Sequence, residues 1–334
     1  MRETLLRYGG RIARGEINPH TRWDGRSGFI LDADNDNVPL ALLSFGIWRL
    51  GDRETTLGTG QREHAVLLVG GTLRLQAADQ TIDLARPDGP FAGYPGASRA
   101  CCVYVPRRIS YSIQGEGEVA VFAAPAADDM PLRAVTAGET ASRGAAVWRR
   151  DVVTLLKPGE TSTNLVVGET HSPPGLWSGT PPHTHDLADP EGGQSDHEEV
   201  YCFRIRRHDP NGAPGGVQFL YGAEGLDEVY SLSDWSVVAL PGGCHPVVAG
   251  PASELLYVWG MASREPQPLR LRDAPAAAFL KDVETAFQRL TESAPRRRID
   301  AGDFDNVVAA HGLDEHGRRT LTLLLREYGF DIEA

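Results

Sequence analysis

The sequence predicts an all-β protein of two β-barrel or jelly-roll domains with a C-terminal α-helical appendage. Short apolar runs separated by Gly, Pro and Asp fill residues 40–125, and the same pattern returns over residues 151–262. No helix-period stretch interrupts either region, and regularly spaced turns are typical of antiparallel sandwiches and barrels. After about residue 264 the apolar residues recur at helical spacing instead, as they do from Phe279 to Leu290.

These changes of pattern divide the 334 residues into parts. The stretch between the two β-rich regions is polar and rich in turn-forming residues, which is typical of a linker. A chain of this length can bury a large core without disulfides. We therefore expect an N-terminal barrel, a linker, a second barrel and a helical extension, at residues 1–130, 131–150, 151–264 and 265–334.

The composition excludes two classes of partner. The chain holds 33 basic and 45 acidic residues, a net charge of −12, and the resulting field repels a nucleic-acid backbone. No apolar run approaches the roughly 18 residues that a membrane span needs. The first twenty residues lack the apolar region of a signal peptide, so we expect a cytoplasmic protein.

We expect the cysteines to be inert thiols: Cys101, Cys102, Cys202 and Cys244.

The two β-rich regions look like copies of each other. Glu199 and Pro241 begin the segments EVYCF and PGGCH and lie 42 residues apart, and His64 and Pro106 begin HAVLL and PRRIS at the same separation. Equal spacing between segments of similar pattern indicates an internal duplication.

A candidate metal site lies in the second region. In PPHTHD, His183 and His185 are two residues apart, so on a strand they present two imidazoles to one side. A third nitrogen is available from His245 in PGGCHP, and a carboxylate from the pair Glu198 and Glu199. Three His and one Glu leave open positions for a substrate on a divalent ion.

Strand alternation lets only one residue of the glutamate pair face the barrel interior. We expect Glu199 there because it directly precedes the strand VYCF, with Glu198 facing outward and His197 in solvent. In the first region, His64 stands at the position of Glu199, Ser110 stands at that of the later histidine, and a His-x-His pair is missing. We therefore expect a metal-free first barrel in which His64 is packed and hydrogen-bonded.

A His-x-His pair, a Glu at the start of the next β run and a His after a Pro-Gly turn resemble the signature of a cupin barrel. More closely, VVGETHSPPGLWSGTPPHTHD, EEVYCFRI, GVQFLYG and PGGCHPVV resemble the 5-deoxy-D-glucuronate isomerase family of inositol catabolism, which is related to 5-keto-4-deoxyuronate isomerase. The resemblance covers residues 40–264 and implies a bicupin. It also implies one divalent ion in the second barrel, Zn or Mn first and Fe or Ni next, on the ligands His183, His185, Glu199 and His245.

Some positions depart from the motif of that family. Leu176, Thr180 and Thr184 stand where Asn, Tyr and Lys are typical, and Gly242 and Cys244 replace larger polar residues. These substitutions surround the expected ligands and leave the exact sugar open. The helical extension has no counterpart in the resemblance.

The resemblance implies an aldose–ketose isomerase that acts on a deoxy sugar acid such as 5-deoxy-D-glucuronate. Such a reaction moves the proton next to a carbonyl, which requires a polarising cation and a proton-transfer group. We expect that group among Glu169, His171 and Tyr201. Arg150 or an arginine from a neighbouring barrel is a candidate partner of the substrate carboxylate, because a guanidinium matches its shape. The expected pocket residues are Trp177, Gln218, Tyr221 and Tyr257.

Two other functions fit the same residues. A cupin dioxygenase would hold iron in the same three-His, one-Glu set, and oxygen uptake separates it from an isomerase. A non-catalytic sugar-binding or regulatory cupin is the second alternative, in which the extension docks a partner. The expected partner of the isomerase is a small sugar acid, with no nucleic acid or membrane. A homodimer is a further hypothesis, because β barrels with exposed edges often pair.

Overall fold

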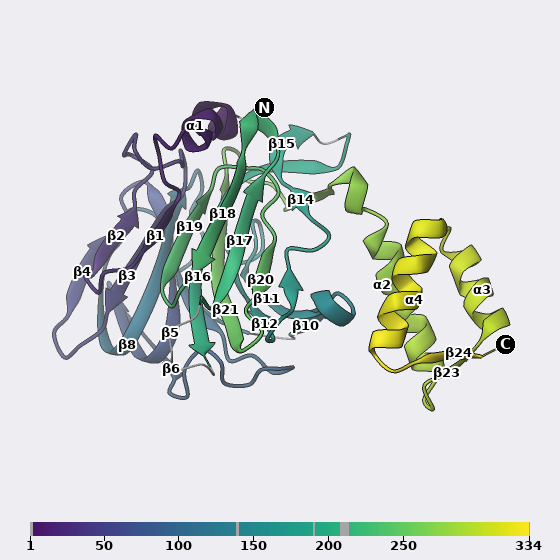
Figure 1. The fold of residues 1–334 in the computed structure, drawn as a ribbon. Helices are drawn as coiled ribbons and strands as arrows, with labels where there is room; N and C mark the ends of the chain where they lie inside the picture. The colour runs from purple at the N-terminus through teal and green to yellow at the C-terminus, as the bar shows by residue number, and fades with distance from the viewer. Residues whose placement is uncertain (1–2, 138–139, 190, 208–213, 334) are drawn as a thin grey trace.

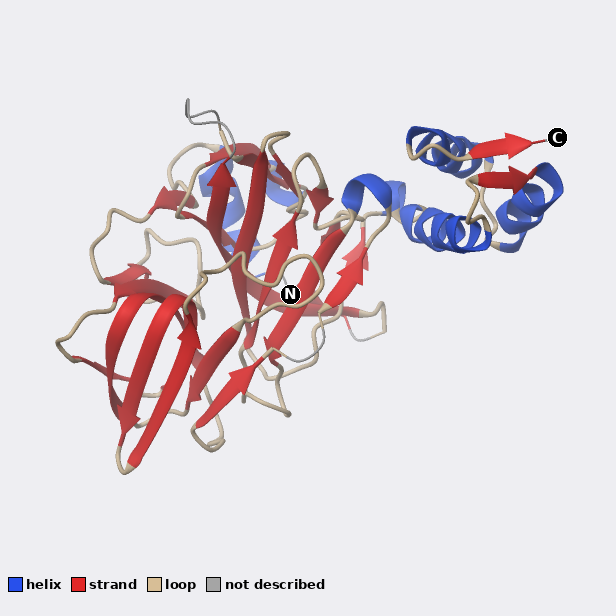
Figure 2. Cartoon of the chain, turned by 90° about the horizontal axis from the view of Figure 1, so that it is seen from below, coloured by secondary structure: helices blue, strands red, loops and turns tan. Residues whose placement is uncertain are grey.

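The computed structural model describes residues 3–137, 140–189, 191–207 and 214–333. Two β-rich bodies lie side by side, and a helical module projects from one side of them (Figure 1, Figure 2). The structure therefore confirms an all-β fold with a C-terminal helical region. None of the helices in these ranges is long and apolar enough to cross a bilayer.

The first barrel is an antiparallel sheet with the strand order β2-β3-β8-β5-β7-β9, to which β4 and β6 add through β8 and β5. Apolar residues on one face of its central strands, such as Val66, Val103 and Val121, fill the barrel interior. The strands are β2 (Gly28–Leu31), β3 (Ser44–Arg49), β4 (Thr55–Gly58), β5 (Arg62–Ala77), β6 (Gln80–Arg86), β7 (Cys101–Val105), β8 (Ser110–Pro125) and β9 (Arg133–Thr136).

The second barrel has a large sheet in the order β1-β19-β16-β21-β12-β11-β10, with β15 on β16, and a smaller sheet in the order β13-β20-β17-β18. A short pair, β14 with β22, lies at its mouth. The strands are β1 (His20–Arg22), β10 (Ala141–Arg143), β11 (Arg150–Leu156), β12 (Val166–Ser172), β13 (Trp177–Ser178), β14 (His183–Thr184), β15 (Asp186–Asp189), β16 (Gln194–Arg207), β17 (Gly216–Tyr221), β18 (Asp227–Leu232), β19 (Ser236–Leu240), β20 (Val247–Ala249), β21 (Ser253–Ser263) and β22 (Arg272–Asp273). Single turns of 3-10 helix interrupt the chain at η1 (Ala146–Trp148), η2 (Ala223–Gly225) and η3 (Pro275–Ala277).

The two barrels repeat one strand order. The series β3-β8-β5-β7 in the first corresponds to β12-β21-β16-β19 in the second. The register agrees as well, because His64 lies opposite Val105 just as Glu199 lies opposite Leu240. The spacing of 42 residues therefore reflects a duplicated β unit.

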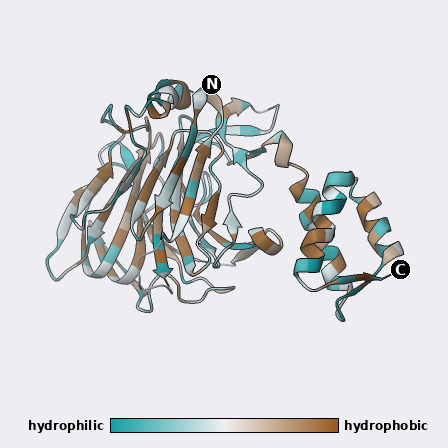
Figure 3. Ribbon diagram, viewed as in Figure 1, coloured by the Kyte–Doolittle hydropathy of each residue, from teal (hydrophilic) through white to brown (hydrophobic). Residues whose placement is uncertain are grey.

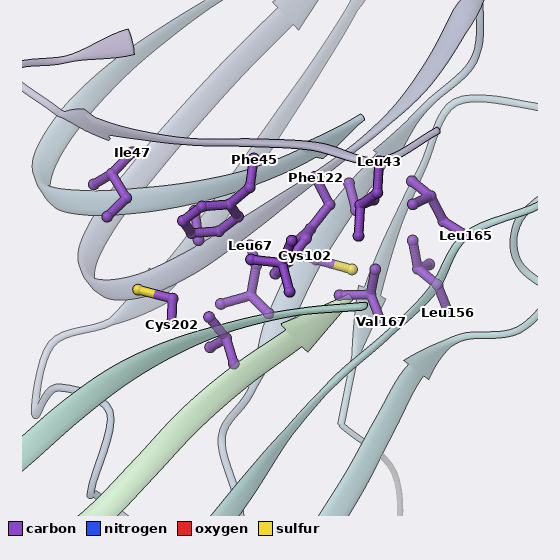
Figure 4. Close-up of a cluster of buried hydrophobic side chains, with 14 of the residues drawn as sticks. Leu43, Phe45, Ile47, Leu67, Cys102, Phe122, Leu156, Leu165, Val167 and Cys202 are labelled. Atoms are coloured by element: carbon purple, nitrogen blue, oxygen red, sulfur yellow. The ribbon is translucent and has the colours of Figure 1, made fainter. Parts of the chain in front are cut away.

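The faces of the two large sheets that point away from the barrel interiors pack against each other. Leu43, Phe45 and Phe122 of the first barrel meet Leu156 and Val167 of the second in one buried cluster (Figure 4). The sheets approach each other closely at Gly260 of β21, where an added Cβ would lie 2.2 Å from the Phe122 ring. The two barrels therefore share a buried interface. A residue that faces out of its own barrel can be as inaccessible to solvent as one that faces the barrel interior.

The N-terminal segment belongs to the second barrel, which corrects the boundary expected at residues 1–130. Helix α1 (Glu3–Ala13) buries Leu5, Tyr8 and Ile12 in the core of the second barrel, and β1 pairs with β19. The expected linker is divided in the same way, because β9 pairs with β7 of the first barrel and β10 with β11 of the second.

The C-terminal extension is a small helical module with its own core. It contains α2 (Leu280–Ser293), α3 (Ala301–Ala310) and α4 (Glu315–Glu327), with the parallel pair β23 (Arg298–Asp300) and β24 (Asp331–Glu333). Asp300 and Asp314 cap α3 and α4 by accepting hydrogen bonds from free amide groups of the first turns. Hydrophobic and hydrophilic residues intersperse on these helices (Figure 3). Their apolar residues cluster with Ala145, Ala146 and Trp148 of the second barrel, so the module docks there.

Candidate metal centre and active-site cavity

Three of the expected ligands converge in the second barrel. One ligand atom from each of His185, Glu199 and His245 lies within 4.8 Å of the other two. Glu199 Oε2 is 3.2 Å from His185 Nε2 and 3.2 Å from His245 Nε2. The ring of His183 lies beside them, with centroid distances of 5.4 Å to the His245 ring and 6.3 Å to the His185 ring. The structure thus brings the predicted residues together from β14, β16 and the turn after β19.

The backbone orients all three imidazoles. Each Nδ1 lies within hydrogen-bond range of a backbone carbonyl, and a carbonyl can only accept, so each Nδ1 donates and carries the proton. In the neutral ring the lone pair is then on Nε2, which is the form that binds a metal. The acceptors are the carbonyls of Pro181 for His183 (2.8 Å), His197 for His185 (3.1 Å) and Gly243 for His245 (2.8 Å).

The turn that presents His245 is held from two sides. Gln218 donates from Nε2 to the carbonyl of His245 at 2.7 Å, and Asp186 accepts from the Gly243 amide at 2.7 Å. Gly242 has φ of 148° and its added Cβ would meet the Asp186 side chain at 2.8 Å, so only glycine fits there. This explains why the sequence places two glycines before His245.

The centre is electrostatically suited to a cation. Burial opposes ionisation of Glu199, but the adjacent His185 and His245 side chains favour its charged form and lower its pKa to about 2. Burial, with the neighbouring imidazoles, lowers the pKa of His183 to about 3, so this ring is neutral at physiological pH. Among the described atoms, His245 Nε2 and Glu199 Oε1 are buried without hydrogen-bond partners. An unpartnered imidazole nitrogen and an unpartnered carboxylate oxygen in one buried cluster fit a divalent ion.

A cavity of about 490 Å³ opens beside this cluster. His183 and Glu199 form one part of its wall, and the phenol rings of Tyr201 and Tyr257 another. Burial, and then the charge of Glu199, raise the pKa of Tyr201 well above its usual value, so its hydroxyl stays protonated. Cationic side chains complete the wall: Arg143, Arg150 and Lys281. Of the residues expected here, the structure places Tyr201, Tyr257 and Arg150 at the cavity.

The expectation that Glu169 and His171 face this cavity is wrong. On β12 the intervening Thr170 lines the cavity, so residues 169 and 171 point to the opposite face, toward the first barrel. Glu169 forms a buried bidentate ion pair with Arg86 of β6, at 2.8 Å for both contacts. His171 Nε2 lies 2.6 Å from Glu254 Oε1, and its ring stacks on Tyr94.

Other expected pocket residues lie outside the cavity lining. Trp177 is partly exposed and stacks on Phe219 of the small sheet. Tyr221 pairs through its backbone with Cys244. Gln218 is buried and acts from behind, because its amide holds the carbonyl of His245.

Glu198 faces out of its own barrel, as expected, but it is buried there against the first barrel. His197 is also buried, which corrects the expectation that it lies in solvent. The Glu198 carboxylate accepts hydrogen bonds from the backbone amides of residues 41–43 in the first barrel. Glu63 of β5 does the same for the amides of residues 163–165 in the second. Each glutamate therefore caps the segment that leads into a strand of the other barrel, β3 for Glu198 and β12 for Glu63. His197 Nδ1 and Ser195 Oγ form a hydrogen bond of 2.9 Å.

In the first barrel, the residue equivalent to Glu199 has a different environment. His64 Nδ1 lies 2.9 Å from the Tyr111 hydroxyl, and its ring makes edge contacts with Phe29 and Tyr111. Burial lowers its pKa to about 4, so it is a neutral, packed imidazole at physiological pH.

Lys281 is a lining residue that the sequence pattern did not indicate. It lies in the extension, about 100 residues after the His-x-His pair, and nothing in its local pattern predicts where α2 docks. The alternation of β12 would have predicted that Thr170 lines the cavity if the inward-facing side of the strand had been known.

The fold and the site together define a bicupin whose second barrel carries a candidate metal centre. The KduI/IolB family model matches residues 17–279, and the chain belongs to the KduI/IolB family. The match ends before α2, so the helical module lies outside it.

The relatives that match in sequence carry one name. The 5-deoxy-glucuronate isomerase of Geobacillus kaustophilus is 34% identical over 168 residues, which are 48% of this chain and 58% of that protein. The 5-deoxy-glucuronate isomerase of Shouchella clausii is 28% identical over 228 residues, which are 65% of this chain and 79% of that protein. The chain thus spans little more than half the length of the Geobacillus relative.

Solved structures agree on the architecture. An IolB-like protein from Salmonella typhimurium superposes with a TM-score of 0.70 at 26% identity, and the match covers 79% of this chain and 99% of that one. Oxalate decarboxylase from Bacillus subtilis superposes with a TM-score of 0.54 at 9% identity, covering 91% of this chain and 86% of that one. The second comparison supports the cupin-like fold alone.

Proposed function

We propose that this protein is a metal-dependent aldose–ketose isomerase that acts on a deoxy sugar acid such as 5-deoxy-D-glucuronate, in inositol catabolism. The observation on which this rests is the cluster of His185, Glu199 and His245 at the wall of a cavity that also holds tyrosine hydroxyls and cationic groups. The family membership and the names of the relatives support the choice of reaction.

The proposed centre assigns one role to the ion and the others to side chains. His183, His185, Glu199 and His245 would hold a divalent ion, Zn or Mn first, which polarises the substrate carbonyl and stabilises the negative charge that develops there. Backbone carbonyls keep the imidazoles in the binding tautomer.

Tyr201 is the proposed proton-transfer residue. Of the side chains expected for that role, it is the one that lines the cavity, two residues after Glu199 on the same face of β16. Its neutral hydroxyl can donate a proton to the carbonyl oxygen of the substrate and recover one from the neighbouring hydroxyl. Its role is therefore the proton transfer between the two oxygens, and the carbon-bound proton passes to a separate base. The apolar flank of Trp259 and Met261 limits the access of water to this step.

The test of the reaction is proton NMR of the metal-loaded protein in D₂O with 5-deoxy-D-glucuronate. We expect the anomeric signals to decay and deuterium to enter at the carbon that exchanges its proton. Oxygen uptake by the iron-loaded protein, without exchange, would favour the dioxygenase alternative. Binding of the sugar acid without conversion, by protein that holds its metal, would favour the non-catalytic alternative.

We expect Tyr201→Phe to lower kcat by about 100-fold, because a positioned acid–base group contributes at least that factor. KM and metal content should stay near the wild-type values, since the hydroxyl is not an expected ligand. Steady-state kinetics and elemental analysis measure these quantities. Tyr230→Phe is the matched control: its hydroxyl lies outside the cavity lining, and in the described structure it has no hydrogen-bond partner. A Tyr201→Phe protein with unchanged kcat would contradict the assignment.

A further inference from the structure

Two arginines of the cavity wall lie directly opposite each other. Arg143 of β10 and Arg150 of β11 are partners in the antiparallel register, which places their side chains on the same face. Arg150 is partly buried and donates from Nη1 to the Trp148 carbonyl at 3.2 Å. Burial, and to a smaller extent the charge of Arg143, lower the pKa of Arg150, against the opposite effects of Tyr257 and Glu284. Like charges opposite each other on a strand pair are unfavourable unless an anion joins them.

The carboxylate whose charge acts on Arg150 is already engaged. Glu284 of α2 accepts a hydrogen bond from the Gly144 amide at 2.8 Å and another from Trp148 Nε1 at 3.3 Å. It therefore ties α2 to the hairpin between β10 and β11. Among the cavity-lining residues that the structure describes, the one carboxylate is Glu199, which the histidines occupy.

The same docking brings a third cation to the cavity. Lys281 lies in the first turn of α2, three residues before Glu284, and lines the cavity. Its ammonium group is 2.5 Å from Asp273 Oδ2. Asp273 stands opposite His183 in the pair of β14 with β22, so this contact lies next to the metal centre. An ammonium group has three donors, so the contact with Asp273 leaves donors for a ligand.

We propose that Arg143, Arg150 and Lys281 form the site for the carboxylate of the substrate, and that helix α2 of the C-terminal extension is therefore part of the active site. The inference rests on the proposed function for the nature of the ligand, a sugar acid. It adds a residue from beyond the family match, which ends at residue 279. The anion joins two opposed guanidinium groups and the ammonium group, which explains why cations of separate elements gather at a wall next to the metal centre.

A direct test uses the scarcity of lysine in this chain. Lys281 and Lys157 are the two lysines of the sequence. The side chains are similarly exposed, at 59% and 53%, and each has an acidic neighbour. An amine-acetylating reagent followed by peptide mass spectrometry can therefore measure the labelling rate at each position in the metal-loaded, full-length protein.

We expect D-glucuronate to slow the labelling of Lys281 by roughly tenfold at ten times its Kd, and to leave Lys157 unchanged. D-glucose, which lacks the carboxylate, should protect Lys281 far less. Equal protection by both sugars, or no protection of Lys281 by saturating D-glucuronate, would overturn the inference. Labelling needs no turnover, so protection without isomerisation would keep the anion site while the proposed reaction fails.

A variant series separates charge from structure. Lys281→Gln should raise KM for 5-deoxy-D-glucuronate by about tenfold or more, because one charge-assisted hydrogen bond is lost, with kcat changed by less than about twofold. Lys281→Arg should restore most of the affinity, since it keeps the positive charge. Lys157→Gln is the control and should match the wild type. If Lys281→Arg is as weak as Lys281→Gln, or if kcat falls and KM does not change, the carboxylate-binding role is wrong.

Discussion

Replacing His185 with alanine is expected to remove the bound metal and to lower kcat/KM by at least about 100-fold. The imidazole is buried, and its Nε2 faces Glu199 Oε2 at 3.2 Å. Its loss leaves a buried carboxylate with one partner fewer and an ion with one ligand fewer. Elemental analysis of the purified variant measures the metal content. Thermal unfolding with and without added Mn or Zn gives a second measurement, because an ion that binds the native state raises Tm by mass action.

His64→Gln is the matched control for that experiment. His64 is buried at the equivalent position of the first barrel, but its Nδ1 pairs with the Tyr111 hydroxyl. We expect this variant to keep one ion per chain and the turnover of the wild type. Retention of the ion and of full activity in His185→Ala, or loss of the ion in His64→Gln, would contradict the assignment of the metal to the second barrel.

The ligand set could be predicted because each of its members follows a simple rule. Two imidazoles at i and i+2 share a side of an extended segment, and a Pro-Gly turn ends a strand at a fixed place. Both copies have the same 42-residue spacing between two matching segments, which equates His245 with Ser110 and Glu199 with His64. The structure shows the same strand order in both copies. Rules of this kind depend only on residues that are close in sequence, so they apply without knowledge of the tertiary structure.

The face on which a side chain lies could not be predicted in the same way. Alternation predicts that Glu169 and His171 share one face of β12, but it does not say which face is the barrel interior. Polar side chains usually mark the solvent-exposed face of a strand or a functional site. Here that rule misleads, because the face of β12 that points away from the barrel interior carries a buried ion pair between the two barrels. Glu198 is a second case: it faces out of its own barrel and into the loop of the other one.

Contacts between distant segments were also beyond the sequence pattern. Leu5, Tyr8 and Ile12 have helical spacing, which indicates an amphipathic helix, yet nothing in that spacing says that the helix packs on the second barrel. Lys281 reaches the cavity only because Glu284 and an apolar cluster dock α2 on the β10–β11 hairpin. Tertiary packing therefore decides part of the cavity wall.

Glu169→Ala is expected to lower the free energy of unfolding by roughly 3–5 kcal/mol, because it leaves a buried guanidinium without its counter-charge. The side chains of Glu169 and Arg86 are fully buried and joined by two hydrogen bonds of 2.8 Å across the barrel interface. The carboxylate also accepts from the hydroxyls of Tyr94 and Ser98 at 2.8 Å each. Urea unfolding followed by circular dichroism measures the loss.

The same β5–β6 hairpin that carries Arg86 offers the control. Asp83 forms a bidentate pair with Arg74 there, at 2.8 and 3.0 Å, but both side chains are largely exposed to water. Asp83→Ala should therefore change stability far less, because water solvates the freed arginine. The double variant Arg86→Met/Glu169→Leu should recover part of the loss, since no charge is then left buried. If Glu169→Ala has unchanged stability but has lost turnover, Glu169 acts in the reaction. The structure argues against this, because Thr170 lines the cavity and Glu169 points to the opposite face of β12.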